Sequence, residues 1–205
     1  MSEGQSVDPT VSRTKFYREI AEYREAEDVY RKRGWLLIRA DFPITEVVLT
    51  APQLKPPAVV TGVRFDYTNY DARPPSVRLV DPFTGDPYRP EQLPTQLFRA
   101  PPAPISFDPG GLADGMRMQL QQPPQPLMQS FGPDDIPFLC LAGVREYHDH
   151  PGHSGDPWEL HRVDGAGRLV RLLEIIDHYG VQPLNGYSIS LVPQIAGFAQ
   201  SPPPA

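Results

Sequence analysis

The sequence has a single cysteine, Cys140, in 205 residues. One cysteine excludes an intrachain disulfide, which favours a reducing compartment. The net charge is −6 and no basic block occurs, so nucleic acid is not an expected partner. No apolar run reaches the roughly 18–20 residues needed to span a membrane, and the first residues lack the layout of a signal peptide. We therefore expect a cytoplasmic protein that does not bind membranes.

Two common catalytic motifs are also missing. The sequence contains no His-Glu-x-x-His, the helical motif of zinc proteases. Gly110-Gly111 is not followed by the Lys-Ser/Thr pair of a phosphate-binding loop. Nucleotide chemistry is therefore not expected.

Proline, by contrast, is abundant, with 27 residues in the chain, against a usual frequency of about 5%. Clusters stand at 101–104, 123–126 and near the C-terminus. Because proline is excluded from helix interiors and central strands, residues 81–130 are predicted to be a Pro-rich irregular insertion. Residues 1–7 and 196–205 are predicted to be disordered ends.

Two segments have the periodicity of amphipathic helices. Asp8-Pro9 is a typical N-cap followed by a first-turn proline, and the pattern predicts a helix over 9–33 that ends at Gly34. A second helix is predicted over 166–179, with Gly180 as its end.

Between the helices, short β-prone segments follow one another with turn residues between them. Strands are predicted over 35–41, 46–50, 59–67 and 76–80, with another short strand over 136–141 and a last one over 187–192. The element order predicts one α+β domain over residues 8–195, with helices on one side of an antiparallel meander.

Residues 138–162 contain the cysteine and four of the five histidines. Glu146, His148 and His150 alternate, so in an extended chain their side chains share one face. A hairpin turn at 142–144 would bring Cys140 across from Glu146. Thiolate, carboxylate and imidazole together suit zinc rather than magnesium or calcium. These four residues are therefore the predicted zinc ligands.

Other residues leave alternatives open. His153 and His161 are spare ligands, and either could replace Glu146. Asp149, Asp156 and Glu159 could orient the imidazole ligands from a second layer. Taken singly, each histidine also fits an ordinary polar loop, and a lone cysteine often acts as a small buried apolar residue.

Cys140, Glu146, His148 and His150 resemble the Cys-Glu-His-His motif of a predicted metal-binding family encoded beside bacterial ubiquitin-like conjugation genes. The element order also resembles that of a ubiquitin-conjugating enzyme (E2), including the paired prolines before Ser76. This resemblance implies an E2-like fold and partners that are a ubiquitin-like protein or E1-like and E2-like pathway proteins.

The chain departs from an E2 in one respect. The His-Pro-Asn motif that precedes an E2 cysteine is missing, and with it the asparagine that stabilises the oxyanion. The favoured interpretation is a zinc-binding accessory module in which Cys140 is a ligand. The alternatives are an active E2-like transferase with Cys140 as the thioester nucleophile, and a zinc hydrolase with Glu146 or Glu159 as general base.

Overall fold

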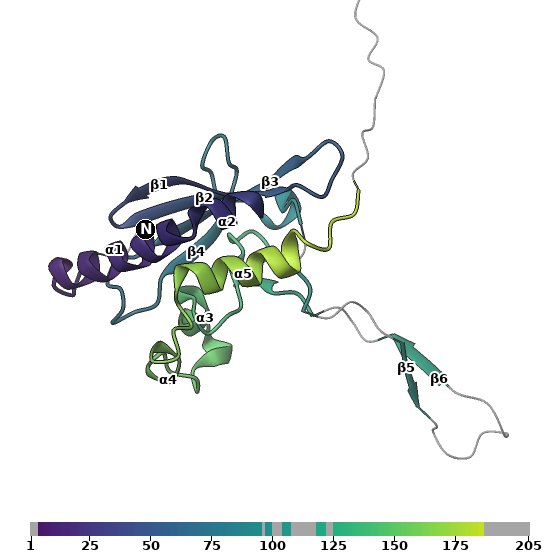
Figure 1. The fold of residues 1–205 in the computed structure, drawn as a ribbon. Helices are drawn as coiled ribbons and strands as arrows, with labels where there is room; N and C mark the ends of the chain where they lie inside the picture. The colour runs from purple at the N-terminus through teal and green to yellow at the C-terminus, as the bar shows by residue number, and fades with distance from the viewer. Residues whose placement is uncertain (1–3, 96, 100–103, 108–117, 122–124, 187–205) are drawn as a thin grey trace, which may run out of the picture.

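The computed structural model describes residues 4–95, 97–99, 104–107, 118–121 and 125–186. These residues form an α+β fold in which α1 and α5 lie on the same side of a four-stranded sheet (Figure 1). The predicted strand over 187–192 and the predicted disordered tail lie outside the described residues. No helix in the described ranges is both long and apolar enough to cross a membrane.

The predicted N-terminal helix is two helices, α1 (Pro9–Glu25) and α2 (Glu27–Lys32). The Asp8 carboxylate accepts a hydrogen bond from the Thr10 backbone N–H at 2.8 Å, as expected for an N-cap. The break falls at Ala26, whose φ of −118° and ψ of 18° are not helical. Apolar periodicity continues across this residue, so the sequence pattern does not reveal the break.

The predicted antiparallel meander is confirmed. Its strands are β1 (Trp35–Asp41), β2 (Ile44–Ala51), β3 (Ala58–Asp66) and β4 (Ser76–Val80), hydrogen-bonded in that order. The register slips between Leu37 and Arg39 on β1 and between Leu49 and Thr50 on β2. Slips of this kind are typical of β-bulges, which bend a strand locally.

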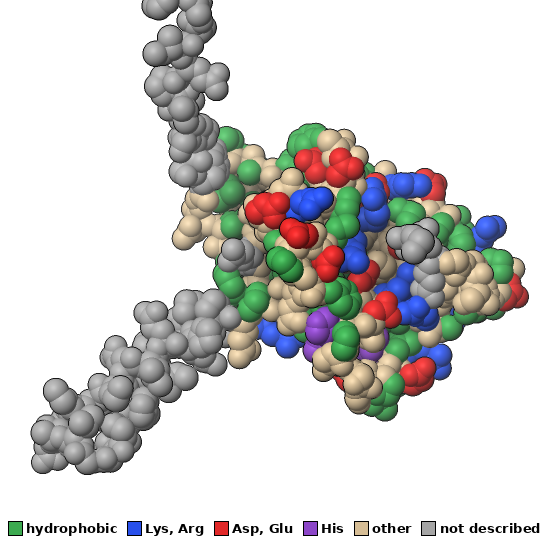
Figure 2. All heavy atoms as spheres, turned by 180° about the vertical axis from the view of Figure 1, so that it is seen from behind, with side chains coloured by type: hydrophobic (Ala, Val, Ile, Leu, Met, Phe, Trp, Pro, Cys, Tyr) green, Lys and Arg blue, Asp and Glu red, His purple; other side chains and the backbone are tan. Residues whose placement is uncertain are grey.

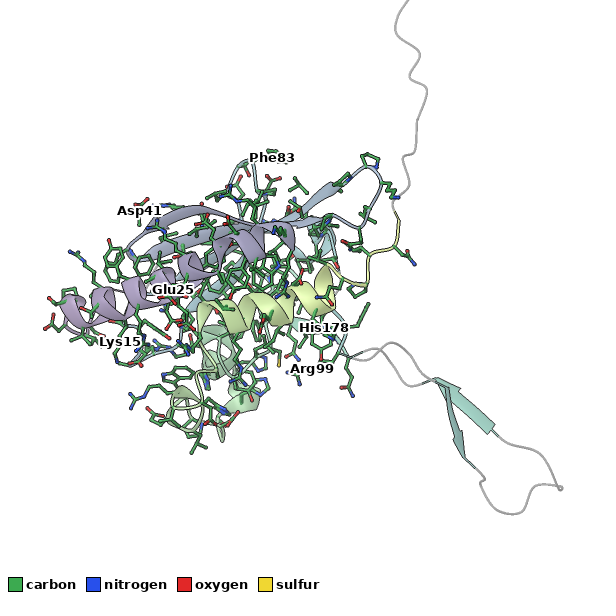
Figure 3. The ribbon with its side chains drawn as sticks, in the orientation of Figure 1. Lys15, Glu25, Asp41, Phe83, Arg99 and His178 are labelled. Atoms are coloured by element: carbon green, nitrogen blue, oxygen red, sulfur yellow. The ribbon has the colours of Figure 1, made fainter. Side chains whose placement is uncertain are left out.

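The core fills the space between the sheet and the two long helices (Figure 3). Helix α5 (Leu169–Gly180) buries the apolar face that its sequence predicts. The largest fully buried side chains come from α1, the start of β1, the end of β3 and the residue that follows β3: Phe16, Tyr23, Trp35, Phe65 and Tyr67. Burial of side chains of this size contributes about 1.5–3 kcal/mol each to folding.

The insertion predicted over 81–130 is described only in part. Its described residues include a 3-10 turn (Pro90–Gln92) and a short ribbon of β5 (Pro104–Phe107) with β6 (Met118–Gln121). Strand β7 (Met128–Gln129) then pairs with β8 (Phe138–Leu139), which is shorter than the strand predicted over 136–141.

The segment after Cys140 is not the predicted hairpin. It forms α3 (Arg145–Asp149), a 3-10 turn (Pro151–His153) and α4 (Glu159–Arg162). A Cβ on Gly143 would lie 2.0 Å from the Ala166 carbonyl oxygen, so this glycine permits close packing onto the loop before α5. The expected extended geometry of residues 146–150 is therefore wrong, because the chain is helical through Asp149 and extended only at His150.

The buried Arg145 fixes α3 against the connection between β3 and β4. Its guanidinium donates to the Thr68 carbonyl at 2.5 Å, and its backbone N–H donates to the Pro75 carbonyl at 2.9 Å. These bonds satisfy backbone oxygens of the β3–β4 connection that have no sheet partner. The helical segment after Cys140 is thus anchored by contacts that are distant in sequence.

Candidate cysteine–histidine site

Cys140 directly follows β8, and its backbone is held from two sides. Its N–H donates to the Leu127 carbonyl at 2.7 Å, and the Arg99 guanidinium donates to the Cys140 carbonyl at 3.2 Å. Arg99 belongs to the insertion, so this part of the insertion is tied to the cysteine. The side chain of Cys140 is half-buried.

His153 is the imidazole next to Cys140. Its Nε2 lies 3.5 Å from the Cys140 Sγ, and its ring stacks on Tyr147 with centroids 3.9 Å apart and planes 17° apart. His153 closes the 3-10 turn that begins at Pro151, whose fixed φ suits a first-turn position. The turn therefore delivers the ring to the cysteine.

Both members of this pair are shifted toward their neutral forms. Burial raises the pKa of the Cys140 thiol, and the nearby Arg99 charge opposes that effect only in part. Burial, followed by the neighbouring His150, lowers the pKa of His153. A neutral imidazole has a free lone pair, which serves equally for metal binding and for accepting a proton.

Asp156 joins three of the rings around this pair. Its carboxylate accepts from the Tyr147 hydroxyl at 2.7 Å and is 2.6 Å from the His161 Nε2. Its carbonyl oxygen is 2.9 Å from the His148 Nδ1. The hydrogen bonds from Tyr147 and His161 hold the pKa of the Asp156 carboxyl below its usual value. Asp156 therefore orients Tyr147, the ring that stacks on His153.

His148 and His150, which the sequence predicts as zinc ligands, lie near the pair. Neither of them forms a set of three metal ligands with it. The His148 Nε2 is 2.7 Å from the Ala142 carbonyl oxygen, so both of its nitrogens face carbonyl groups. His150 packs its ring 5.4 Å from that of His153, and its Nδ1 accepts from the Gly152 N–H. Figure 2 shows histidine side chains close together on one face.

Glu146 is turned away from these rings and is buried against β4. Its carboxylate accepts a short hydrogen bond from the Ser76 hydroxyl and lies 3.1 Å from the Arg78 guanidinium. The helical course of α3 separates it from the face that holds His153. The structure thus brings Cys140 together with His153, which the sequence names only as a spare ligand, and not with Glu146.

Among the described residues, the candidate site consists of two side chains, Cys140 and His153. Within the ranges that the structure covers, no three His, Cys, Asp or Glu side chains are grouped closely enough to hold a metal ion. The zinc site predicted from the sequence stays a prediction. The sequence carried no signal for Arg99, which lies 41 residues before Cys140, whereas the Tyr147 stacking follows from the turn at Pro151.

The described residues make up an α+β protein with an N-terminal helix, a four-stranded antiparallel meander, and a cysteine–histidine pair that precedes α5. The Y4jH family model matches residues 7–184, so the chain belongs to the Y4jH family. It is 42% identical over 202 residues to "Uncharacterized protein y4jH" of Sinorhizobium fredii (strain NBRC 101917 / NGR234). The match covers 98% of each chain.

Proposed function

We propose that the chain is a zinc-binding module with an E2-like layout, and that it acts as an accessory component of a bacterial ubiquitin-like conjugation pathway in the cytoplasm. The observation that carries the metal is the distance between Cys140 and His153. Zinc bonds of about 2.3 Å to sulfur and about 2.0 Å to nitrogen, at a tetrahedral angle, separate the two ligand atoms by about 3.5 Å. The Cys140 Sγ and His153 Nε2 are 3.5 Å apart.

The proposed site begins with Cys140 and His153. His148 and His150 are the candidates to complete it, and His153 takes the role first given to Glu146. Glu146 is left out because its carboxylate already has three polar partners on β4. Zinc would lower the pKa of the thiol, which offsets the burial that otherwise favours the neutral form.

Support for the conjugation pathway is the element order and the Cys-Glu-His-His resemblance. The helix, the meander, the paired prolines before β4 and a cysteine before the last helix follow the order of an E2. In this proposal the metal holds the loop that an E2 uses for its active site. A ubiquitin-like protein and E1-like or E2-like proteins are the proposed partners.

Zinc content tests this proposal directly. Protein purified without chelator and dialysed exhaustively should hold about one zinc per chain by elemental analysis. Cys140→Ala and His153→Ala should each lose most of it, whereas His178→Ala, on α5, should keep it. Zinc that stays bound in both site variants would rule out the centre, and so would a wild-type chain that takes up none on incubation with zinc.

A transferase is the second candidate, because the same His153 nitrogen is within reach of a thiol proton. A neutral imidazole beside a thiol is the arrangement of a cysteine nucleophile and its base. Two observations weigh against it. Burial raises the pKa of the thiol, which lowers the thiolate fraction. The asparagine that stabilises the oxyanion of an E2 is also missing before Cys140. Asn69 is far from Cys140 in sequence, and its side-chain oxygen accepts from the N–H groups of Ser6 and Val7.

The transferase has its own test. The chain is incubated with an activating enzyme from a bacterial ubiquitin-like pathway, its modifier and ATP. A reductant-sensitive adduct that disappears in Cys140→Ser would establish Cys140 as a thioester carrier. We expect no adduct from the zinc-loaded protein, since a zinc-bound thiolate is a poor nucleophile.

A further inference from the structure

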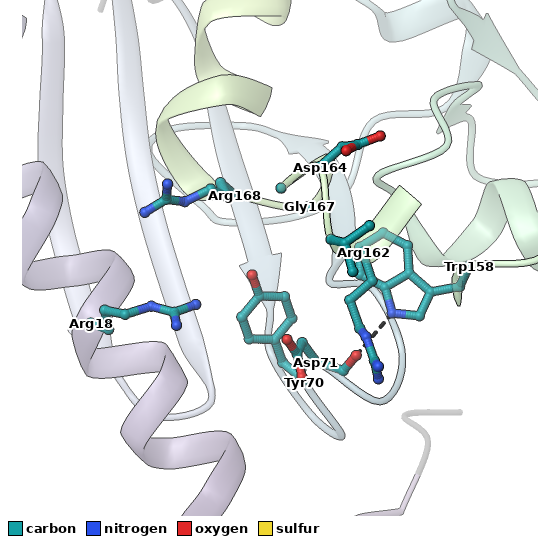
Figure 4. A pocket seen from close by; sticks show the side chains of 10 residues that line it. Arg18, Tyr70, Asp71, Trp158, Arg162, Asp164, Gly167 and Arg168 are labelled. Carbon is teal, nitrogen blue, oxygen red and sulfur yellow. Dashed lines mark hydrogen bonds between the residues drawn. The ribbon is translucent and has the colours of Figure 1, made fainter. Parts of the chain in front are cut away.

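A pocket of ≈ 370 Å³ lies apart from the cysteine–histidine pair, between α1, the connection from β3 to β4 and the segment that leads into α5 (Figure 4). The Trp158 indole N–H donates to the Asp71 carbonyl at 2.9 Å, which joins two of its walls. Charged side chains on these walls are three arginines and two aspartates: Arg18, Arg162, Arg168, Asp71 and Asp164.

The buried carboxylate of Glu19 bonds to Tyr70, which lines the pocket, and to the start of α5. Glu19 is 2% exposed, and its carboxylate accepts from the Leu169 backbone N–H at 3.2 Å and from the Tyr70 hydroxyl at 3.4 Å. Glu19 thereby provides the negative charge that the N-terminus of α5 favours. Because the chain's own carboxylate occupies that helix end, the helix end does not contribute to a ligand site.

Several of the charged groups on the walls already have ion-pair partners. Asp71 forms an ion pair with Lys15, so its charge is already balanced. Arg18 and Arg168 pair with Glu19 and Glu22 near the surface, where the arginine side chains are 58% and 43% exposed. The Arg168–Glu22 pair is exposed on both sides and contributes little to stability, so the Arg168 guanidinium can turn toward a ligand at low cost. Arg18 pairs with the buried Glu19 and is therefore retained by the fold.

Arg162 is the arginine on the walls that has no ion-pair partner among the described residues. Its guanidinium makes no ion pair and no hydrogen bond with any residue that the structure describes. It lines the pocket next to Trp158, and Figure 4 shows both side chains on the same wall. A guanidinium offers two parallel N–H donors, which match the two oxygens of a carboxylate.

We propose that this pocket binds a small molecule or peptide end through a single carboxylate, with Arg162 as the principal donor. The single guanidinium without an ion-pair partner, that of Arg162, matches one carboxylate better than a dianionic phosphate. The volume lies at the lower end of the roughly 300–1,000 Å³ range of ligand pockets, so the bound group is small. The proposal does not depend on the zinc site.

The probe is N-acetylglycine, with its amide, N-acetylglycinamide, as the neutral control and inorganic phosphate as the dianionic comparison. Binding is followed by protein NMR through the Trp158 indole N–H signal. The carboxylate is expected to saturate the shift, and the amide is expected to bind at least about tenfold more weakly, because it cannot accept charge-assisted hydrogen bonds as an anion does. A C-terminal peptide with a free and with an amidated end separates a peptide source from a small acid.

Arg162→Ala should weaken carboxylate binding about tenfold or more, and Arg162→Lys should restore part of it. Arg31→Ala is the matched control, since it removes one exposed arginine charge outside the pocket. Equal weakening in Arg31→Ala would overturn the proposal, as would the absence of saturable binding in wild type. Phosphate binding more tightly than the carboxylate would overturn the assignment of the ligand class. Circular dichroism of each variant establishes that it is folded.

Discussion

The Cys140 Sγ and the His153 Nε2 lie 3.5 Å apart across 13 residues of chain. The contact depends on two local features. Arg99 and Leu127 fix the backbone of the cysteine, and the turn from Pro151 brings the imidazole back toward it. Neither feature involves Glu146, so the pairing is independent of the carboxylate that the sequence pattern first suggests.

Alkylation of Cys140 should report its raised pKa. Because burial raises the pKa of the thiol above its ordinary value of 9.0, the thiolate that reacts is scarce at neutral pH. The rate with iodoacetamide in metal-free protein should rise with pH and have its inflection above 9.0. Arg99→Ala removes the opposing positive charge and should move the inflection higher still.

The control for this experiment is Arg31→Ala, which removes a charge on α2 and should leave the inflection where wild type has it. An inflection well below 9.0 in metal-free wild type would contradict the burial argument. It would also favour the transferase over the zinc module, because an acidic thiol is the better nucleophile at neutral pH.

The fold follows from the sequence to a large extent because its signals are local. Alternating apolar residues determine which strand faces are buried, and the helix periodicity of 166–179 gives α5 its buried face. The break at Ala26 has no such signal. It is a backbone feature in a segment whose apolar residues keep helical spacing on both sides.

The candidate site could not be predicted as well as the fold. Helix α3 is stabilised by groups that are far from it in the sequence. Alternation at 146, 148 and 150 suggests a strand, but Arg145 bonds to carbonyls of the β3–β4 connection and favours a helix. Tertiary contacts of this kind override local pattern. The side chains that were expected on one face are consequently divided between β4 and the rings near Cys140.

Two tyrosines of the core should respond in opposite directions to loss of their hydroxyl groups. The Tyr67 hydroxyl is buried and has no hydrogen-bond partner among the described residues, whereas the Tyr70 hydroxyl donates to Glu19 at 3.4 Å. Tyr67→Phe should therefore raise the free energy of unfolding by about 1 kcal/mol, and Tyr70→Phe should lower it by a similar amount. Urea denaturation of the pair measures both, and destabilisation by Tyr67→Phe would show that its hydroxyl is satisfied.

Asn69 should couple the start of the chain to the β3–β4 connection. The sequence predicts disorder over residues 1–7, yet the Asn69 Oδ1 accepts from the Ser6 N–H at 2.7 Å and the Val7 N–H at 3.0 Å. Asn69 has a φ of 63°, which glycine adopts without strain. Asn69→Gly isolates the loss of the side chain, and should cost about 1–3 kcal/mol.

A second variant decides whether that cost comes from the N-terminal segment. If it does, deletion of residues 1–7 should cost a similar amount, and Asn69→Gly should cost little more in the shortened chain. Additive effects in this double-mutant cycle would mean that Asn69 stabilises the β3–β4 connection by itself.

Glu146 should be important for the stability of the metal-free fold and unimportant for zinc. Its buried carboxylate faces the Arg78 guanidinium at 3.1 Å and bonds to the Ser76 hydroxyl. Glu146→Gln keeps the size of the side chain but leaves a partly buried guanidinium without its counter-charge. Loss of one partner from a buried pair costs about 3–5 kcal/mol, and the partial exposure of Arg78, whose side chain is 27% accessible, reduces this to about 2–3 kcal/mol.

The control is Glu159→Gln, which removes an exposed carboxylate from α4 and should change the free energy of unfolding by less than about 0.5 kcal/mol. Urea denaturation in the presence of chelator gives the metal-free stability of both variants, and elemental analysis gives their zinc content. A Glu146→Gln chain that unfolds at the wild-type urea concentration but loses its zinc would contradict the assignment of Glu146 as a stabilising residue that does not bind zinc. In that case Glu146 must leave Ser76 to bind the metal, and the ligand set first predicted from the sequence would replace the set built on His153.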